Sequence, residues 1–313
     1  MRRVVLASLV FGSVISRSAR AAPPVAAPAP STPQLVALIP ADDARASIAL
    51  GPRGEVYEPD GKGAWMRKQQ ITTADKLAIA GRAGGMVVAN GEGVVYRLAA
   101  NGWSALRLAQ KGLAIMSGGS RAIAAVGRQL YALDHTIAGE PAKLALAGAP
   151  VLAIGAGKGI VIATERGLLR VDGAKLTPIA GAPRKVARLV SDLWAVVDGG
   201  ALDLRSNKTT PWPVGLTILL TASSADDSLV GVARAHGKLE LVTLRGGKLD
   251  REPISLTPVG DPVGIVVDRK GRAVVALRDG RLVSRAKAGN WEVTTVSDAL
   301  PTPRPGPPPA LSQ

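Results

Sequence analysis

Cysteine is absent from this chain of 313 residues. Its absence excludes disulfide bonds, thiolate metal sites, a cysteine nucleophile and a lipid-modified cysteine. Aromatic residues are also scarce, at 3% with a single Phe, so the core has to be built from Val, Leu, Ile and Ala. The two histidines, His135 and His236, lie at separate predicted turns, and no pattern of further ligands accompanies either. We therefore expect neither a cofactor nor a metal site.

Long apolar segments are missing as well. After residue 21, no apolar run approaches the roughly 20 residues that a membrane-spanning helix needs. Glycine (36 residues) and proline (23 residues) interrupt the chain frequently, which favours many short elements over long helices. Together with the aliphatic composition, this predicts an all-β protein.

Both ends of the chain differ from the middle. Residues 1–21 have a basic start at Arg2 and Arg3, an apolar run and an Ala-x-Ala site ending at Ala21, which is the layout of a secretory signal peptide. We predict cleavage after Ala21 and a periplasmic or extracellular protein, with a retained signal anchor as the alternative. Residues 22–33 and 299–313 are Pro-rich, which predicts a linker and a disordered tail around a folded region at 34–298.

Acidic residues are outnumbered by basic ones. The formal net charge is +15, and +11 remains outside the signal peptide, which holds four of the positive charges. Such an excess favours contact with an anionic partner. Because the basic residues are scattered and form no runs, a solvated, arginine-rich surface is the alternative explanation. We expect a protein or an anionic envelope component as partner and no nucleic acid.

A short motif occurs seven times in the folded region. Its copies are GEVYEP from Gly54, GVVYRL from Gly93, RQLYAL from Arg128, RGLLRV from Arg166, GALDLR from Gly200, GKLELV from Gly237 and GRLVSR from Gly280. The fourth residues of the copies lie 34 to 43 residues apart, at Tyr57, Tyr96, Tyr131, Leu169, Asp203, Glu240 and Val283. A period of about 38 residues with strand-type composition is the signature of a propeller blade.

Further strand patterns flank each copy. A stretch of small apolar residues, such as GIVIAT (159–164), directly precedes the motif and predicts the second strand of a unit. A further apolar stretch upstream, such as VLAIGAG (151–157), predicts the first strand, and a fourth strand is predicted after the motif. In four copies a tryptophan opens the fourth strand, and we expect it to fill the gap between neighbouring blades: Trp65, Trp103, Trp212 and Trp291. The pattern predicts a β-propeller with seven four-stranded blades, or six if one copy is irregular.

Two segments resemble known propeller families. DPVGIVVDRKGRAVVALRDGRLVSR (261–285) resembles a blade of the NHL or gluconolactonase-like kind, and RQLYALDHT (128–136) is similar to the repeat of quinoprotein-type and outer-membrane-assembly propellers. The shared implication is an exported β-propeller of the broad WD-repeat, NHL and quinoprotein-like group. The second match lacks the tryptophan that usually follows that run.

Arginine recurs at one place in the repeat. Five copies have it at the predicted turn between the second and third strands, at Arg53, Arg128, Arg166, Arg234 and Arg278. Such turns open on the same side of a propeller, so these side chains would form a crown that binds carboxylate, phosphate or sulfate groups. The alternative is that an arginine-rich chain simply exposes arginine at its turns.

Catalytic patterns are weak by comparison. Four acids precede glycine in predicted hairpin turns, at Asp60, Asp172, Asp198 and Asp279, where Asp-Gly has a structural role. The acids left for a catalytic or calcium cluster are Asp42, Asp43, Asp75, Asp226, Asp227, Asp261 and Asp268. No GxSxG motif is present, and GAGKG (155–159) lacks the ending of a phosphate-binding loop.

The function predicted from the sequence is therefore an exported, non-enzymatic binding or scaffold propeller that presents one loop face to its partner. The alternative is an exported propeller enzyme of the lactonase, lyase or glycosidase type, with carboxylates at the mouth of the channel. A group of three or more acids around one point would favour the enzyme.

Overall fold

The computed structural model describes residues 33–39, 47–71, 77–80, 86–90, 92–99, 102–108, 115–117, 122–137, 140–183, 185–268, 271–287 and 289–298. The predicted signal peptide, the linker up to residue 32 and the C-terminal tail lie outside these residues. Within them, no helix is long and apolar enough to cross a membrane.

Strands are the only regular secondary structure of the described residues, and they run in chain order from β1 to β28. The first half comprises β1 (Ala37–Ile39), β2 (Ile48–Leu50), β3 (Glu55–Pro59), β4 (Trp65–Gln70), β5 (Leu77–Ala80), β6 (Met86–Asn90), β7 (Val94–Ala99), β8 (Gly102–Arg107), β9 (Ile115–Ser117), β10 (Ile123–Val126), β11 (Gln129–Ile137), β12 (Glu140–Leu146), β13 (Val151–Ala156) and β14 (Ile160–Thr164). The second half comprises β15 (Gly167–Asp172), β16 (Lys175–Pro178), β17 (Val186–Val190), β18 (Trp194–Val197), β19 (Gly200–Asp203), β20 (Lys208–Pro211), β21 (Leu216–Ser223), β22 (Leu229–Ala235), β23 (Lys238–Arg245), β24 (Lys248–Ile254), β25 (Pro262–Val267), β26 (Ala273–Leu277), β27 (Arg281–Lys287) and β28 (Asn290–Ser297).

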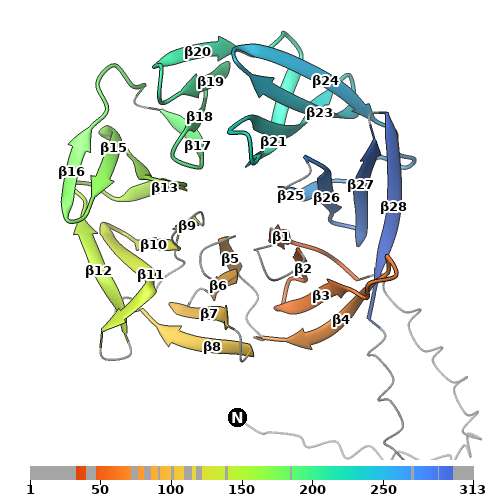
Figure 1. The fold of residues 1–313 in the computed structure, drawn as a ribbon, viewed down its shortest axis with the longest axis horizontal. Helices are drawn as coiled ribbons and strands as arrows, with labels where there is room; N and C mark the ends of the chain where they lie inside the picture. Colours follow the sequence, from red (N-terminus) through yellow and green to blue (C-terminus); the bar gives the residue numbers. More distant parts are fainter. Residues whose placement is uncertain are drawn as a thin grey trace, which may run out of the picture. The chain divides into compact units, whose positions relative to one another are not determined.

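These strands build antiparallel sheets from consecutive runs of four. Five sheets are four-stranded, and an eight-stranded sheet contains the first run (β1 to β4) and the last (β25 to β28), joined through β4 and β28. The first strand of each run contacts the first strand of the next, and β25 contacts β1. The sheets therefore stand around a common axis, with first strands innermost and fourth strands at the rim (Figure 1).

The sequence repeat corresponds to one part of each run. All seven matched residues, from Tyr57 to Val283, lie in the third strand of their run, so each motif copy begins the outer hairpin of its run. All four Asp-Gly pairs lie in hairpin turns, and their glycines have positive φ values of 56° to 84°. Glycine adopts this backbone conformation without the steric cost that a side chain imposes. The predicted strand order and the structural role of these turns are confirmed.

Apolar side chains fill the spaces between neighbouring sheets. One cluster joins Ile123 and Leu130 of β10 and β11 to Ile154 and Ile162 of β13 and β14. The tryptophans pack against such clusters: Trp65 between the last and first runs, Trp103 between the first two, Trp212 between β18 and β22, and Trp291 between β23 and β26. The expectation that they fill the gaps between sheets is confirmed.

One of these tryptophans does not stand where the sequence reading placed it. Trp212 was expected to open the fourth strand of its run, but it follows the last residue of that strand, β20. β19 has only four residues and ends at Asp203, so β20 already begins at Lys208. Trp212 therefore lies just after the end of β20, whereas the sequence places it at the beginning of that strand. Its backbone N–H donates a hydrogen bond to the Gly199 carbonyl (2.8 Å).

Two glycines allow the innermost strands to approach one another. A Cβ added at Gly155 of β13 would lie 1.8 Å from the Ser191 carbonyl oxygen, and one at Gly264 of β25 would lie 2.5 Å from the Leu38 nitrogen. Both obstacles are backbone atoms, which cannot rotate away. The absence of a side chain at these positions is therefore required for the spacing of the inner strands.

The ring closes through its outermost strands as well as its innermost ones. β28 pairs in parallel with β4 through Val296 with Trp65 and Ser297 with Met66. Beside this short ladder, the buried Tyr57 hydroxyl donates a hydrogen bond of 2.7 Å to the Asp298 carboxylate. Burial and this carboxylate raise the pKa of Tyr57 well above its ordinary value of 10.0.

We expect Tyr57→Phe to lower the free energy of unfolding by about 1.5–3 kcal/mol, the usual contribution of a hydrogen bond to a charged group. The raised pKa means that the folded chain keeps the phenol proton at pH values where the unfolded chain has lost it, so stability should fall as the pH rises above about 10. Urea unfolding at about pH 8 and pH 11 measures both effects. Tyr96→Phe, at the same repeat position, is the control; an equal loss in both variants would contradict the role of Tyr57 in closure.

Candidate functional site

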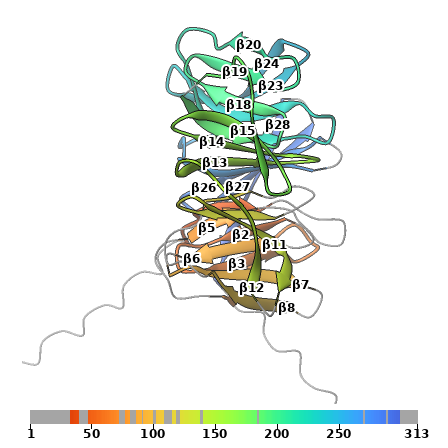
Figure 2. The same cartoon turned by 90° about the vertical axis from the view of Figure 1, so that its left-hand side faces the viewer.

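The four-stranded runs give the ring two ends. The turns between second and third strands and the connections from each fourth strand to the next first strand lie at one end, called the connection end here because antiparallel strands reverse direction at each turn. The remaining turns lie at the opposite end. Backbone hydrogen bonds join the two kinds of loop at the connection end, as between Val151 and Gly127 (2.8 Å) and between Arg278 and Asp261 (2.8 Å). Figure 2 shows the ring from the side, with turns of the sheets on either side.

Four of the five predicted arginines lie in the turns at the connection end. They are Arg53 between β2 and β3, Arg128 between β10 and β11, Arg166 between β14 and β15, and Arg278 between β26 and β27. Arg234 is not in a turn, because β22 continues to Ala235 and pairs Arg234 with Leu239 of β23. That part of the prediction was wrong, although Arg234 is still close to the connection end.

The five arginines differ in their partners. Arg53 forms an ion pair with Glu55 (3.2 Å), and Arg234 forms one with Asp261 (3.3 Å). Arg128, Arg166 and Arg278 are exposed, and in the described part of the chain no carboxylate lies within ion-pair distance of them. A uniform crown is therefore not present: two positive charges are already matched, and three are available to a partner.

Arg128 and Arg166 lie on either side of one connection, residues 147–150 between β12 and β13. The Arg128 Nε donates a hydrogen bond to the Ala147 carbonyl (2.8 Å), and the Ala147 N–H donates one to the Arg128 carbonyl (2.9 Å). From the next sheet, an Arg166 guanidinium nitrogen comes within 3.5 Å of the Cβ position of Gly148. Two guanidinium groups are thus held beside the same short segment.

Large apolar side chains are exposed at the same end of the ring. Among the described residues, five large hydrophobic side chains are exposed, and four of them flank or lie in the connections between sheets: Leu146 (62%), Leu152 (51%), Val214 (104%) and Val259 (44%). The fifth, Val293, lies within β28. Exposed apolar groups next to unpaired cations are typical of a binding surface.

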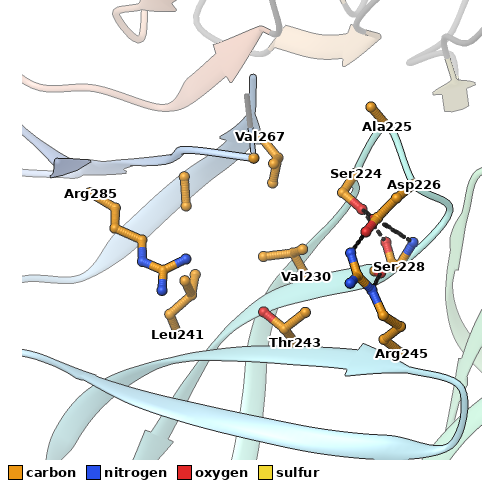
Figure 3. A pocket seen from close by; sticks show the side chains of 12 residues that line it. Ser224, Ala225, Asp226, Ser228, Val230, Leu241, Thr243, Arg245, Val267 and Arg285 are labelled. Carbon is orange, nitrogen blue, oxygen red and sulfur yellow. Dashed lines mark hydrogen bonds and ion pairs between the residues drawn. The ribbon is translucent and has the colours of Figure 1, made fainter. Parts of the chain in front are cut away.

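A pocket of about 340 Å³ lies at the opposite end, between β22–β23 and β25–β27. Its walls are aliphatic, with Val230, Leu241, Val267 and Ala273, and its rim is polar. Figure 3 shows Arg245 beside Asp226 on one side of the pocket and Arg285 on the other.

Both arginines of this pocket already have carboxylate partners. Arg245 forms an ion pair with Asp226 and donates from Nε to the Ser228 hydroxyl (3.1 Å). Arg285 contacts Glu252 of β24 (2.5 Å) across the boundary between two sheets. An anion entering the pocket would have to displace Asp226 or Glu252, so we do not regard it as the anion site that the sequence predicts.

The acids proposed for a catalytic or calcium cluster do not converge where the structure describes them. Asp226, Asp227, Asp261 and Asp268 form ion pairs with four different arginines, at Arg245, Arg205, Arg234 and Arg272. Asp42, Asp43 and Asp75 lie outside the described residues. Across the described ranges, no three His, Asp or Glu side chains stand close enough together to hold a metal ion.

The histidines are far apart in the fold. His236 is exposed in the turn between β22 and β23 with a positive φ of 48°. His135 was predicted at a turn but lies within β11, because that strand continues past a register shift between Ala132 and Thr136. The histidine pattern offers no acid/base pair.

The GAGKG segment ends β13 with Gly155 and Ala156, and its residues 157–159 form the turn between β13 and β14. The Asp192 carboxylate, from the turn between β17 and β18, accepts a hydrogen bond from the Gly159 N–H (2.7 Å), and a Cβ at Gly157 would lie 1.9 Å from that carboxylate. The glycines therefore make room for a buried aspartate of the neighbouring sheet, which confirms the reading of this segment as a turn.

Comparison with known proteins identifies the fold. No family model matches the chain, and the search of curated proteins found no similar sequence. Among solved structures, the WD40 β-propeller domain of Doa1 is 12% identical (TM-score 0.56; 82% of this chain, 94% of that one) and streptogramin B lyase is 14% identical (TM-score 0.58; 84% and 95%). YCF48 from Cyanidioschyzon merolae is 17% identical (TM-score 0.57; 82% and 96%). The chain is a β-propeller, and the predicted likeness to the broad WD-repeat, NHL and quinoprotein-like group is confirmed.

The exposed leucines are the part of the site that sequence reasoning missed. Leu146 and Leu152 stand at the end of one strand and the start of another, where an apolar residue is indistinguishable in sequence from a core residue. A signal was present in the short connection Ala-Gly-Ala-Pro at 147–150. Its residues are too small to cover the neighbouring side chains.

Proposed function

We propose that this protein is an exported, non-enzymatic binding or scaffold propeller with seven blades, counting the eight-stranded sheet as two. It presents the connection end to a protein or anionic partner in the cell envelope. The sequence supports export through the signal-peptide pattern of residues 1–21. The strand runs support the blade number, since β1 to β4 and β25 to β28 each repeat the four-strand pattern of the other sheets.

One observation carries the proposal: the exposed apolar side chains and the unpaired arginines occur at the same end of the ring. Leu146, Leu152, Val214 and Val259 all lie there, as do Arg128, Arg166 and Arg278. Apolar groups contribute binding free energy by leaving water, and guanidinium groups orient an acidic partner through charge-assisted hydrogen bonds.

The observed acids favour binding over catalysis. Hydrolytic or lyase chemistry with carboxylates needs two of them facing one substrate position, whereas the described candidates are paired separately with arginines. The similar structures include both a WD40 domain and a lyase, so the fold alone favours neither.

The proposal is tested by comparing two charge-matched variants of the full chain. One replaces Arg128, Arg166 and Arg278 by alanine; the control replaces three exposed lysines of the opposite end, Lys158, Lys175 and Lys208. The probes are phosphatidylglycerol vesicles, polygalacturonate and a displayed library of random 12-residue peptides. Because the connection end provides the arginines, we expect the arginine variant to lose about tenfold in affinity for at least one probe and the lysine variant less than about twofold.

Equal losses in the two variants would mean that only the overall charge matters, and absence of binding to all three probes would contradict a binding role for this end. Thermal unfolding of both variants checks that the fold is intact. Six exposed side chains are changed in total, so little loss of stability is expected from either variant.

A further inference from the structure

We infer that one radial strip of the connection end binds an extended segment of a partner protein, in which an acidic side chain stands between two apolar ones. The strip consists of Leu146, Arg128, Arg166 and Leu152. The inference rests on the proposed function and specifies which kinds of side chains the partner of that surface presents.

The backbone beneath the strip is fixed from both sides. Arg128 exchanges two hydrogen bonds with Ala147, and the Val151 N–H donates one to the Gly127 carbonyl (2.8 Å). These bonds tie the connection at 147–150 to the preceding turn, so the groups around it keep their positions before a partner arrives. A preorganised surface loses less conformational entropy on binding than a loose loop does.

The centre of the strip is positively charged. Arg128 and Arg166 come from turns of neighbouring sheets and reach the connection at Ala147 and Gly148. The acid nearest to Arg166 in the sequence is its neighbour Glu165. Among the described residues, no ion pair joins the two side chains. Two guanidinium groups beside one small-residue segment are suited to a carboxylate placed between them.

The two ends of the strip are apolar. Leu146 ends the rim strand β12, and Leu152 follows at the start of the innermost strand β13, where the ladder with β14 has a register shift. Their side chains are 62% and 51% exposed. Figure 1 shows β12 at the rim and β13 near the axis, so the connection between them crosses the sheet from outside to inside.

The spacing fits an extended peptide. Rim and inner strands of a four-stranded sheet are separated by three strand spacings, which is about 14 Å. An extended chain covers about 3.3 Å per residue, and alternate side chains point to the same side. Residues i and i+4 of a partner would therefore reach the two leucines, and residue i+2 would reach the arginines. The expected pattern is apolar-x-acidic-x-apolar.

Charge argues against a second copy of this chain as the occupant. The same surface on a second copy carries the same unpaired arginines, and like charges facing one another weaken association. A free anion or an anionic lipid headgroup would match the arginines but would leave Leu146 and Leu152 uncovered. A segment of a protein partner satisfies both kinds of group.

The experiment selects peptides from a displayed library of random 12-residue peptides on the full chain and measures their affinities by fluorescence anisotropy. We expect enriched peptides to share the apolar-x-acidic-x-apolar pattern. Arg128→Ala with Arg166→Ala, and separately Leu146→Ser with Leu152→Ser, should each weaken binding at least about tenfold. Val214→Ser with Val259→Ser tests whether the rest of the connection end contributes. The matched control, Val293→Ser, removes an exposed apolar group of β28 outside that end and should change affinity less than about twofold.

A charge reversal adds a positive test that loss of folding cannot imitate. Arg128→Glu with Arg166→Glu should prefer the selected peptide with Lys in place of its acidic residue over the original peptide. Enriched peptides that depend on Val214 and Val259 but not on the strip would overturn this inference and leave the proposed function standing. A library that yields no binding peptide would contradict both.

Discussion

Replacing Gly155 by alanine should lower the free energy of unfolding by about 3 kcal/mol or more. The added Cβ would stand 1.8 Å from the Ser191 carbonyl oxygen and 2.9 Å from the carbon of the same group. Since the obstacle is backbone, innermost strands β13 and β17 have to move apart, and the clusters packed beside them open as well. The change in the urea midpoint, at constant slope, measures the effect.

Gly148→Ala is the control for this experiment. A Cβ there meets only an Arg166 guanidinium nitrogen at 3.5 Å, which is ordinary contact with the end of a flexible side chain. We expect its stability to stay within about 1 kcal/mol of the unchanged protein. Equal destabilisation by the two substitutions, or none by Gly155→Ala, would show that the inner strands are not held at the spacing described.

Trp194→Ala should be the second severe substitution, with a loss of about 3–5 kcal/mol. The side chain is 3% exposed in β18 and packs in the cluster between β17–β19 and β22–β23. Its indole N–H donates a hydrogen bond to the Asp227 carbonyl (2.8 Å), and the Arg205 guanidinium lies 5.7 Å from the ring centroid. The substitution removes packing, a hydrogen bond and a cation–π contact at one sheet boundary.

Trp194→Phe and Trp212→Ala separate these contributions. The phenylalanine variant keeps most of the apolar packing and should lose only about 1–2 kcal/mol, because Asp227 is an exposed residue whose carbonyl can accept a hydrogen bond from water instead. Trp212 packs at the same boundary but is only half-buried, so its removal should cost less than that of Trp194. A larger loss for Trp212→Ala would contradict the assignment of Trp194 as the main contact there.

The repeat was the part of the fold that the sequence predicted best. Each four-stranded unit packs against its two neighbours in the same way, so residues of the same kind recur at regular spacing in the sequence. Tyr57, Tyr96 and Tyr131, chosen from the pattern alone, all lie in third strands. The closing contact between β4 and β28 could not be predicted. It consists of only two residue pairs, which lie more than 200 residues apart in the sequence, and no periodicity indicates it.

The errors in the predicted site have local causes. Arg234 was assigned to a turn because strand ends cannot be located in sequence to better than a few residues, and β22 continues two residues beyond Ala233. The ion pairs of Arg53 with Glu55 and Arg234 with Asp261 depend on side-chain directions that the spacing does not determine. The spacing of the strands predicted that these arginines lie near one end of the ring. Only the side-chain contacts show which of them form ion pairs with a carboxylate.

Exposure was the least predictable property. Leu146 and Leu152 lie directly beside the buried residues Ala145 and Val151 of the same strands. The register shift at the start of β13 changes which side of the strand each following residue faces, and hydrophobic patterning gives no sign of it. The candidate binding surface therefore became visible only once the ring was assembled.

Hydroxyl-radical footprinting of the full chain, with and without a peptide selected on it, tests the account most directly. The five large hydrophobic residues that are exposed in the described part of the chain serve as reporters, with Leu146, Leu152, Val214 and Val259 at the connection end and Val293 in β28. We predict that the peptide protects Leu146 and Leu152 and leaves Val293 as reactive as before. Protection of Val293 with no change at the connection end would contradict the account.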